Sequence, residues 1–226
     1  MQRCGVRYGS VADLVRCRHA CGVQMETKSL RLFVAIRVPD SVKAELGGVQ
    51  SELKHSLPPK SAAWTKPEAM HLTLRFLGQV EEGRVAELSA KLRVALTRFG
   101  AVDLICERLG CFPDLRYPRV VWAWAHDAGE RLQALHRLVD GATAEFAEKP
   151  AEKRFEGHIT IARLKGIKRS DAETLGEFIK AAVDRRFGQW RCEAVELIRS
   201  ELTPQGSCYT TLATIRSEGT VTDGNQ

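Results

Sequence analysis

Apolar and polar residues alternate along seven short stretches of the chain, and this period of two predicts β-strands. The stretches cover residues 30–38, 70–76, 103–109, 119–124, 156–162, 190–200 and 207–216. Between them, apolar residues recur every three or four positions, which predicts amphipathic helices over 42–57, 81–99, 128–146 and 171–186. The pattern therefore predicts an α+β chain in which strands and helices interleave.

Two of the predicted strands carry the same short motif, in which histidine, an apolar residue, threonine and a second apolar residue follow one another. The first copy is His71-Leu72-Thr73-Leu74 and the second is His158-Ile159-Thr160-Ile161. Because a strand points alternate side chains to opposite faces, each motif presents its histidine and threonine on one face and its apolar residues on the other. A single such motif is more often structural, but its repetition in two strands favours a function.

Two histidines and two threonines facing each other suit chemistry at a phosphorus centre. Displacement at phosphorus needs a base on the entering side and an acid on the leaving side, and histidine serves as either near neutral pH. Threonine hydroxyls donate hydrogen bonds to phosphate oxygens. In a regular strand, Arg75 shares the face of His71 and adds a positive charge, whereas Arg163 falls on the face opposite His158.

The segments 71–78 (HLTLRFLG) and 155–163 (FEGHITIAR) resemble the two signature motifs of the 2H phosphoesterases. Within that superfamily the chain is most similar to the RNA 2′,3′-cyclic phosphodiesterases of the LigT or ThpR type, formerly called 2′-5′ RNA ligases. The resemblance covers about residues 29–216. It implies a two-lobed α+β fold of antiparallel sheets with outer helices, related by a pseudo-two-fold axis around a central cleft. One departure is Gly157, where the family pattern leads us to expect proline.

The resemblance also implies an activity: hydrolysis of a terminal 2′,3′-cyclic phosphate of RNA to a 2′-phosphomonoester. By the same resemblance, His71 is the proton donor and His158 the proton acceptor, while Thr73 and Thr160 bind the phosphoryl oxygens. Arg75 is a further candidate for substrate binding. We expect no cofactor and no metal, RNA as the partner, and a monomer.

Other functions fit the same residues. A metal-dependent phosphoesterase would use the histidines as ligands, but neither four-residue motif contains the aspartate or glutamate that such sites commonly need. Three further alternatives are a non-catalytic module that binds RNA ends, a phosphodiesterase of small cyclic nucleotides, and a 2′-5′ RNA ligase, which catalyses the reverse of the same chemistry. A bell-shaped pH–rate profile and activity in chelator distinguish the two-histidine mechanism from the metal-dependent one.

Composition adds little to this interpretation. The 226 residues include 44% hydrophobic and 27% charged residues, with a net charge of +6, which suits a polyanionic partner without requiring one. The seven scattered cysteines favour reduced thiols and a cytoplasmic location, and we expect Cys106, Cys192 and Cys208 to be core residues. No apolar run approaches the length of a membrane span.

The two ends of the chain differ from the rest. Residues 1–28 are expected to be a disordered extension or an over-long start, since Met25 directly precedes the family-like segment. Cys17 and Cys21 lack the second pair of ligands that a structural zinc site needs. Residues 29–216 are expected to form one two-lobed domain, and residues 217–226 a disordered tail.

Overall fold

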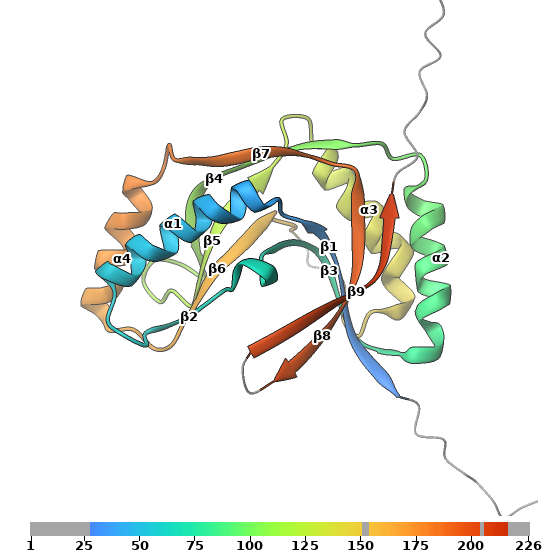
Figure 1. Ribbon diagram of the computed structural model, residues 1–226, viewed down its shortest axis with the longest axis horizontal. Helices are drawn as coiled ribbons and strands as arrows, with labels where there is room; N and C mark the ends of the chain where they lie inside the picture. The colour runs from blue at the N-terminus through green and yellow to red at the C-terminus, as the bar shows by residue number, and fades with distance from the viewer. Residues whose placement is uncertain (1–27, 151–153, 204–205, 217–226) are drawn as a thin grey trace, which may run out of the picture.

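The structure is a computed structural model that describes residues 28–150, 154–203 and 206–216 (Figure 1). The expectations for residues 1–27, including Met25 and the Cys17–Cys21 pair, and for the tail 217–226 lie outside these residues. The strands are β1 (Ser29–Arg37), β2 (Ala62–Trp64), β3 (His71–Glu81), β4 (Val102–Phe112), β5 (Val120–His126), β6 (His158–Leu164), β7 (Arg186–Cys192), β8 (Ala194–Thr203) and β9 (Gly206–Arg216). The helices are α1 (Asp40–Ser56), α2 (Val85–Leu96), α3 (Arg131–Thr143) and α4 (Arg169–Ala181).

All nine strands belong to one antiparallel sheet with the order β7-β4-β5-β6-β3-β1-β8-β9, and β2 pairs with β6. The two motif strands, β3 and β6, are neighbours at its centre. On either side the order is symmetric: β1, β8 and β9 follow β3, and β5, β4 and β7 follow β6. We call these sets the β3 half and the β6 half, and their relation is the pseudo-two-fold symmetry that the resemblance implies.

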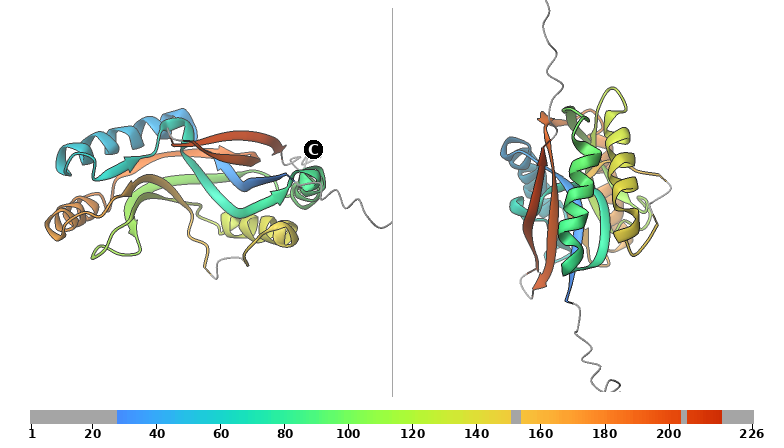
Figure 2. Two further views of the ribbon diagram at one scale, coloured as in Figure 1. Left: turned by 90° about the horizontal axis from the view of Figure 1, so that it is seen from below. Right: turned by 90° about the vertical axis from the view of Figure 1, so that its right-hand side faces the viewer.

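The helices lie in pairs at the two ends of the sheet. Figure 1 shows α1 and α4 together at one end and α2 and α3 at the other, and Figure 2 shows the curved sheet running between them. Helix α1 packs on β7, α4 on β4, α2 on β9 and α3 on β3. None of the helices in the described ranges combines the length and the apolar character that a membrane crossing requires.

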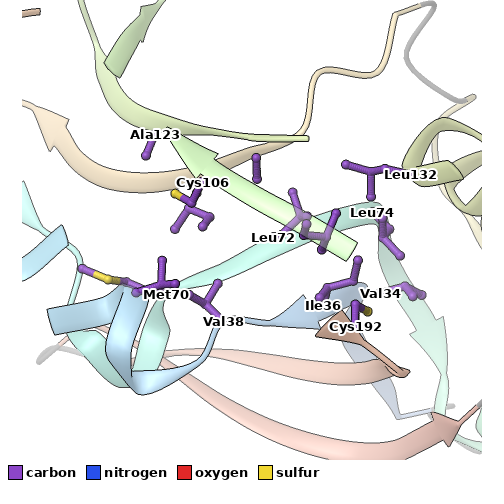
Figure 3. Packing of buried hydrophobic residues seen from close by; sticks show 14 of the residues in the cluster. Val34, Ile36, Val38, Met70, Leu72, Leu74, Cys106, Ala123, Leu132 and Cys192 are labelled. Carbon is purple, nitrogen blue, oxygen red and sulfur yellow. The ribbon is translucent and has the colours of Figure 1, made fainter. Parts of the chain in front are cut away.

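One hydrophobic core extends through both halves of the sheet. Leu72 and Leu74 of β3 point into it beside Val34 and Ile36 of β1, and Ala123 of β5 lies in the same interior (Figure 3). These are the apolar positions of the alternating pattern, so the period of two identified the buried face. Burial of this face fixes the register of the strands, because a shift by one residue would expose every apolar side chain.

The structure corrects several details of the predicted elements. The stretch 190–200 is not one strand: β7 ends at Cys192 and β8 begins at Ala194, in opposite halves of the sheet. The alternation changes phase at the crossing, because Ala194 and Val195 are consecutive apolar residues, and the predicted single strand ran through this break. Strand β2 was not predicted, and helix α4 ends at Ala181 rather than at residue 186. Cys106 and Cys192 are buried as expected, but Cys208 is exposed on the edge strand β9.

Candidate active site

The register of the central strands brings both motifs together on one face of the sheet. Leu72 pairs directly with Ile159, and both point into the core. One residue to either side, the antiparallel register sets His71 beside Thr160 and Thr73 beside His158. The histidine of each motif thus lies next to the threonine of the other, on the face opposite the core.

A β-bulge follows each threonine and changes which later side chains share this face. In β3 the pairing with β1 passes from Ala35↔Thr73 to Val34↔Arg75, which leaves Leu74 as the extra residue. In β6 the pairing with β5 passes from Trp122↔Thr160 to Val121↔Ala162, which leaves Ile161 as the extra residue. A bulge of this kind reverses the alternation beyond it.

The first bulge places Arg75 on the face opposite that expected for a regular strand, and its role in substrate binding stays a prediction. Arg75 pairs with Val34, a core residue, so it lies on the face opposite His71. There its Nε is 3.1 Å from Oδ1 of Asp140 on α3, and its Nη2 donates a hydrogen bond of 2.7 Å to the carbonyl of Lys149. Phe76, which is 57% exposed, takes the position on the His71 face instead.

The second bulge has the opposite effect on Arg163. This residue pairs with Val120, which lies two positions from Trp122 and shares its face. Arg163 is therefore on the same face as His158, contrary to the expectation for a regular strand. It is exposed, and its positive charge acts on His71.

Both histidines are held by the same local hydrogen bond. Nδ1 of His71 donates to the carbonyl of Ala69 at 2.8 Å, and Nδ1 of His158 donates to the carbonyl of Glu156 at 2.7 Å. A carbonyl oxygen only accepts, so Nδ1 carries a proton in each ring. In the neutral form, Nε2 of each ring is then the nitrogen that is able to accept a proton.

Aromatic rings from β1 and β9 pack against one imidazole, and rings from β4 and β5 pack against the other. The rings of Phe33 and Tyr209 lie 4.7 and 5.2 Å from His71. The rings of Phe112 and Trp122 lie 5.0 and 6.0 Å from His158. Phe33 is fully buried behind His71, so it fixes the imidazole rather than offering a surface for a base.

The surroundings make His71 difficult to protonate in the free protein. Burial lowers the pKa of His71 to about 4, against the effect of its hydrogen bond to Ala69, which raises it. The nearby charges of His158 and Arg163 make smaller contributions to this lowering of the pKa. His71 is therefore neutral near pH 7 in the absence of a ligand.

A groove of about 590 Å³ opens beside the two motifs. Its lining includes Thr73, Arg75 and His158, the exposed Phe76, and Lys149 from the segment that leads into β6. This volume is in the range of small-molecule sites. His136 also lines the groove and stacks on Phe155, with ring centroids 4.1 Å apart. It is 9% exposed, so the structure places it in the wall.

Gly157, immediately before the second motif, is a position where the backbones come very close. A Cβ atom built there lies 2.3 Å from the carbonyl oxygen of Ala125, far inside van der Waals contact. The Gly157 carbonyl accepts a hydrogen bond of 2.9 Å from Ala125. In this chain a proline would not fit without a shift of β5, so the departure from the family pattern agrees with the local packing.

Sequence reasoning missed Phe112 and Trp122 as parts of the site, and it placed Arg163 on the wrong face. Trp122 was identifiable only from its pairing with Thr160, and Phe112 only from the pairing of β4 with β5. Gly110 is a local indication of this packing, because only glycine leaves room for the Trp122 ring. A Cβ atom at residue 110 would lie 2.3 Å from a ring atom of Trp122. Within the described ranges, no three or more histidine, cysteine or acidic side chains are grouped so as to hold a metal ion.

Comparison with known proteins gives a consistent result. The model of a family described as LigT-like phosphoesterase matches residues 36–122 and 124–209. The RNA 2′,3′-cyclic phosphodiesterase of Methanothermobacter thermautotrophicus is 31% identical over 189 residues, which are 83% of this chain and 98% of that protein. The enzyme of the same name from Aquifex aeolicus is 29% identical over 184 residues, 81% of this chain and 95% of its own.

Solved structures show the same fold. One from Thermus thermophilus has a TM-score of 0.69 and 28% identity, and the match covers 84% of this chain and all of that one. The structure of Escherichia coli LigT complexed with 3′-AMP has a TM-score of 0.66 over 84% of this chain and 99% of its own. At 21% identity, this second likeness concerns the fold alone.

Proposed function

Because the chain belongs to the LigT-like phosphoesterase family, we propose that it hydrolyses the terminal 2′,3′-cyclic phosphate of an RNA to a 2′-phosphomonoester. In this reaction a water oxygen bonds to phosphorus, the bond from phosphorus to the 3′ oxygen breaks, and the 3′ oxygen takes up a proton. Relatives named RNA 2′,3′-cyclic phosphodiesterases match more than four-fifths of the chain, which supports this choice of substrate.

The single observation that carries the proposal is the matched pair of histidines. Each imidazole donates Nδ1–H to the carbonyl two residues before it, so each leaves Nε2 for proton transfer on the shared face. An in-line displacement needs two such groups, one to take a proton from water and one to give a proton to the leaving oxygen. Because the acid protonates the leaving oxygen directly, the mechanism needs no metal ion.

We assign His158 as the base and His71 as the acid. The acid must be protonated when the substrate is bound, yet its pKa in the free protein is about 4. The bound cyclic phosphate carries a negative charge, and an adjacent opposite charge raises the pKa of an imidazole. Substrate binding is therefore expected to be coupled to proton uptake by His71.

Three further side chains act on the phosphate in this proposal. The hydroxyls of Thr73 and Thr160 donate hydrogen bonds to its non-bridging oxygens, where negative charge grows in the transition state. Arg163 adds a positive charge on the same face. Arg75 lies on the opposite face, where its guanidinium is paired with Asp140.

The test is hydrolysis of an oligoribonucleotide that ends in a 2′,3′-cyclic phosphate, measured in EDTA. We expect wild type to release only the 2′-phosphate, and His71→Ala and His158→Ala each to lower kcat by at least about 100-fold, since general acid–base groups contribute roughly 10²–10⁴-fold. His55→Ala is the matched control, because His55 is exposed at the end of α1. It should leave kcat unchanged.

The pH profile tests the assignment of roles. A plot of rate against pH is expected to be bell-shaped. His71→Ala should remove one side of this curve. In wild type, the midpoint of that side should lie at higher pH for kcat than for kcat/KM, since the bound phosphate raises the pKa of His71. Turnover that is lost in EDTA and restored by a divalent ion would contradict the proposal. Turnover of small cyclic nucleotides with no activity on the oligoribonucleotide would identify a different substrate for the same site.

A further inference from the structure

A second and larger hollow, of about 800 Å³, lies at the far end of β6 from His158. Its walls are the β4–β5 loop, the connection from β6 to α4 and the first turns of α4. We call it the basic hollow and define it by Leu115, Arg116, Tyr117, Arg119, Lys168 and Arg169. The volume is in the range of ligand sites, and neither histidine motif lines it.

Most of the positive charge in the basic hollow has no acidic partner. Its lining contains four cationic side chains and one acid, Glu173. Glu173 pairs with Arg169 at 3.0 Å. Within the described residues, no carboxylate lies within ion-pair distance of Arg116, Arg119 or Lys168, and all three are exposed. Three free cations around one concavity favour an anion with several charged groups.

The rim of the basic hollow also offers an aromatic surface. Tyr117 is 70% exposed and Leu115 beside it is 40% exposed. The loop that carries them is fixed at its base, where Asp114 Oδ1 accepts hydrogen bonds from the backbone N–H groups of Arg116 and Tyr117 at 2.8 and 3.0 Å. An exposed tyrosine among cations is the arrangement that binds single-stranded nucleic acid, by stacking on bases and pairing with phosphates.

Backbone contacts connect this hollow to the active site. The Arg119 N–H donates to the carbonyl of Phe112 at 2.7 Å, and the Phe112 ring packs against His158. The Leu164 N–H donates to the carbonyl of Arg119 at 2.8 Å. Arg163, which precedes Leu164, is on the histidine face. Leu164 lines the basic hollow, so the hollow begins one residue along β6 from Arg163.

We propose that the basic hollow binds the RNA chain on the 5′ side of the terminal cyclic phosphate. Arg116, Arg119 and Lys168 pair with backbone phosphates, and Tyr117 stacks on a base. The inference rests on the proposed function and narrows its substrate class, because a nucleoside 2′,3′-cyclic monophosphate has no upstream phosphate to reach this hollow. The enzyme then distinguishes an RNA strand from a cyclic mononucleotide by contacts remote from the reacting bond.

The experiment compares two substrates and two triple variants. The substrates are an oligoribonucleotide ending in a 2′,3′-cyclic phosphate and a nucleoside 2′,3′-cyclic monophosphate. The test variant is Arg116→Gln/Arg119→Gln/Lys168→Gln. The control variant, Arg93→Gln/Arg98→Gln/Arg137→Gln, removes the same charge from exposed positions on and beside α2 and α3.

For the test variant we expect KM for the oligoribonucleotide to rise about tenfold or more, with kcat/KM for the cyclic mononucleotide unchanged. The slope of log affinity against log salt should decrease by up to about 2, since each phosphate contact on a single strand contributes roughly 0.7. Tyr117→Ala should raise the same KM by roughly fivefold or more, and Tyr117→Phe should not, because phenylalanine also stacks.

If the test and control variants raised KM for the oligoribonucleotide equally, the effect would come from overall charge and not from the basic hollow. That result would overturn the proposal. An unchanged KM for the oligoribonucleotide in the test variant would overturn it as well. Binding of a labelled oligoribonucleotide ending in a 2′-phosphate, followed by fluorescence anisotropy, gives the same comparison without turnover. A wild type that binds this RNA through the basic hollow but cleaves neither substrate would refute the proposed function and leave the binding site standing.

Discussion

At the scale of single residues, the imidazole of His71 combines two environments with opposite effects. Its hydrogen bond to the Ala69 carbonyl favours the protonated ring, whereas burial and the charges of His158 and Arg163 favour the neutral ring. Burial has the largest effect, which lowers the pKa to about 4. The folded protein therefore resists protonation of the residue that we propose as the acid, and in that proposal the negative charge of the bound substrate raises its pKa.

This shift predicts a pH dependence of stability. Between pH 4 and 6.5, the unfolded chain protonates His71 and the folded chain does not, so the free energy of unfolding falls as the pH decreases through this window. A shift of this size corresponds to about 3 kcal/mol. His71→Asn removes the titration and keeps an N–H donor for the Ala69 carbonyl. Urea unfolding at a series of pH values should show a shallower loss for this variant than for wild type.

His55→Asn is the control for this measurement, because it removes an exposed imidazole from α1. Its curve of unfolding free energy against pH should run parallel to that of wild type. If the His71→Asn curve ran parallel too, the low pKa of His71 in the folded state would be refuted.

At the scale of elements, the two bulges determine which arginine lies on the histidine face. In each motif strand the extra residue follows the threonine, Leu74 in β3 and Ile161 in β6. Beyond each bulge, the fifth residue after the histidine returns to the histidine face, and this residue is Phe76 in β3 and Arg163 in β6. The two motifs are thus alike up to the bulge and differ in charge after it.

This arrangement predicts opposite effects for two arginine substitutions. Arg163→Gln should lower kcat/KM for a cyclic mononucleotide by about tenfold or more and change the unfolding free energy by less than about 0.5 kcal/mol, since Arg163 is exposed. Arg75→Gln should cost about 2 kcal/mol of stability, because it leaves Asp140 and the Lys149 carbonyl without their partner. Urea unfolding and steady-state kinetics on both variants make the comparison.

Two outcomes would contradict this prediction. If Arg75→Gln reduced kcat/KM at unchanged stability, or if Arg163→Gln destabilised the fold, the bulges would not place the two residues as described. Each variant serves as the control for the other, because both remove one positive charge by the same change.

The bulges also mark the limit of what the sequence predicted. The period of two identified the buried faces of β1, β3 and β6, and the repeated motif identified the four residues that the structure brings together. A bulge inserts a residue without altering the apolar character of its neighbours, so Arg75 and Arg163 were each assigned to the wrong face. Phe112 and Trp122 depend on strand pairing over long distances, which no local pattern contains.

At the scale of the whole molecule, the two halves of the sheet are interleaved along the chain. The β3 half takes β1 and β3 from early segments and β8 and β9 from the last ones, while the β6 half takes β4 to β7 from the middle. One hydrophobic core includes residues of both halves. The halves are therefore expected to unfold together, since most of the buried hydrophobic residues belong to this shared core.

The tryptophans provide a direct test of this cooperativity. All four, Trp64, Trp122, Trp124 and Trp190, lie in β2, β5 and β7 on the β6 side. Leu88, on α2 at the other end, is fully buried. Leu88→Ala should cost about 3 kcal/mol and shift the transitions followed by tryptophan fluorescence and by far-UV circular dichroism equally. A fluorescence midpoint that stayed at the wild-type value would show that the halves unfold separately.

The pairing of β8 with β1 has a consequence for synthesis of the chain. Strand β1, which holds Phe33 behind His71, is translated well before its partner β8. A nascent chain that stops before β8 contains both histidines but lacks the strand that completes the support of His71. In the proposed mechanism, such a chain is expected to be inactive until β8 has been translated.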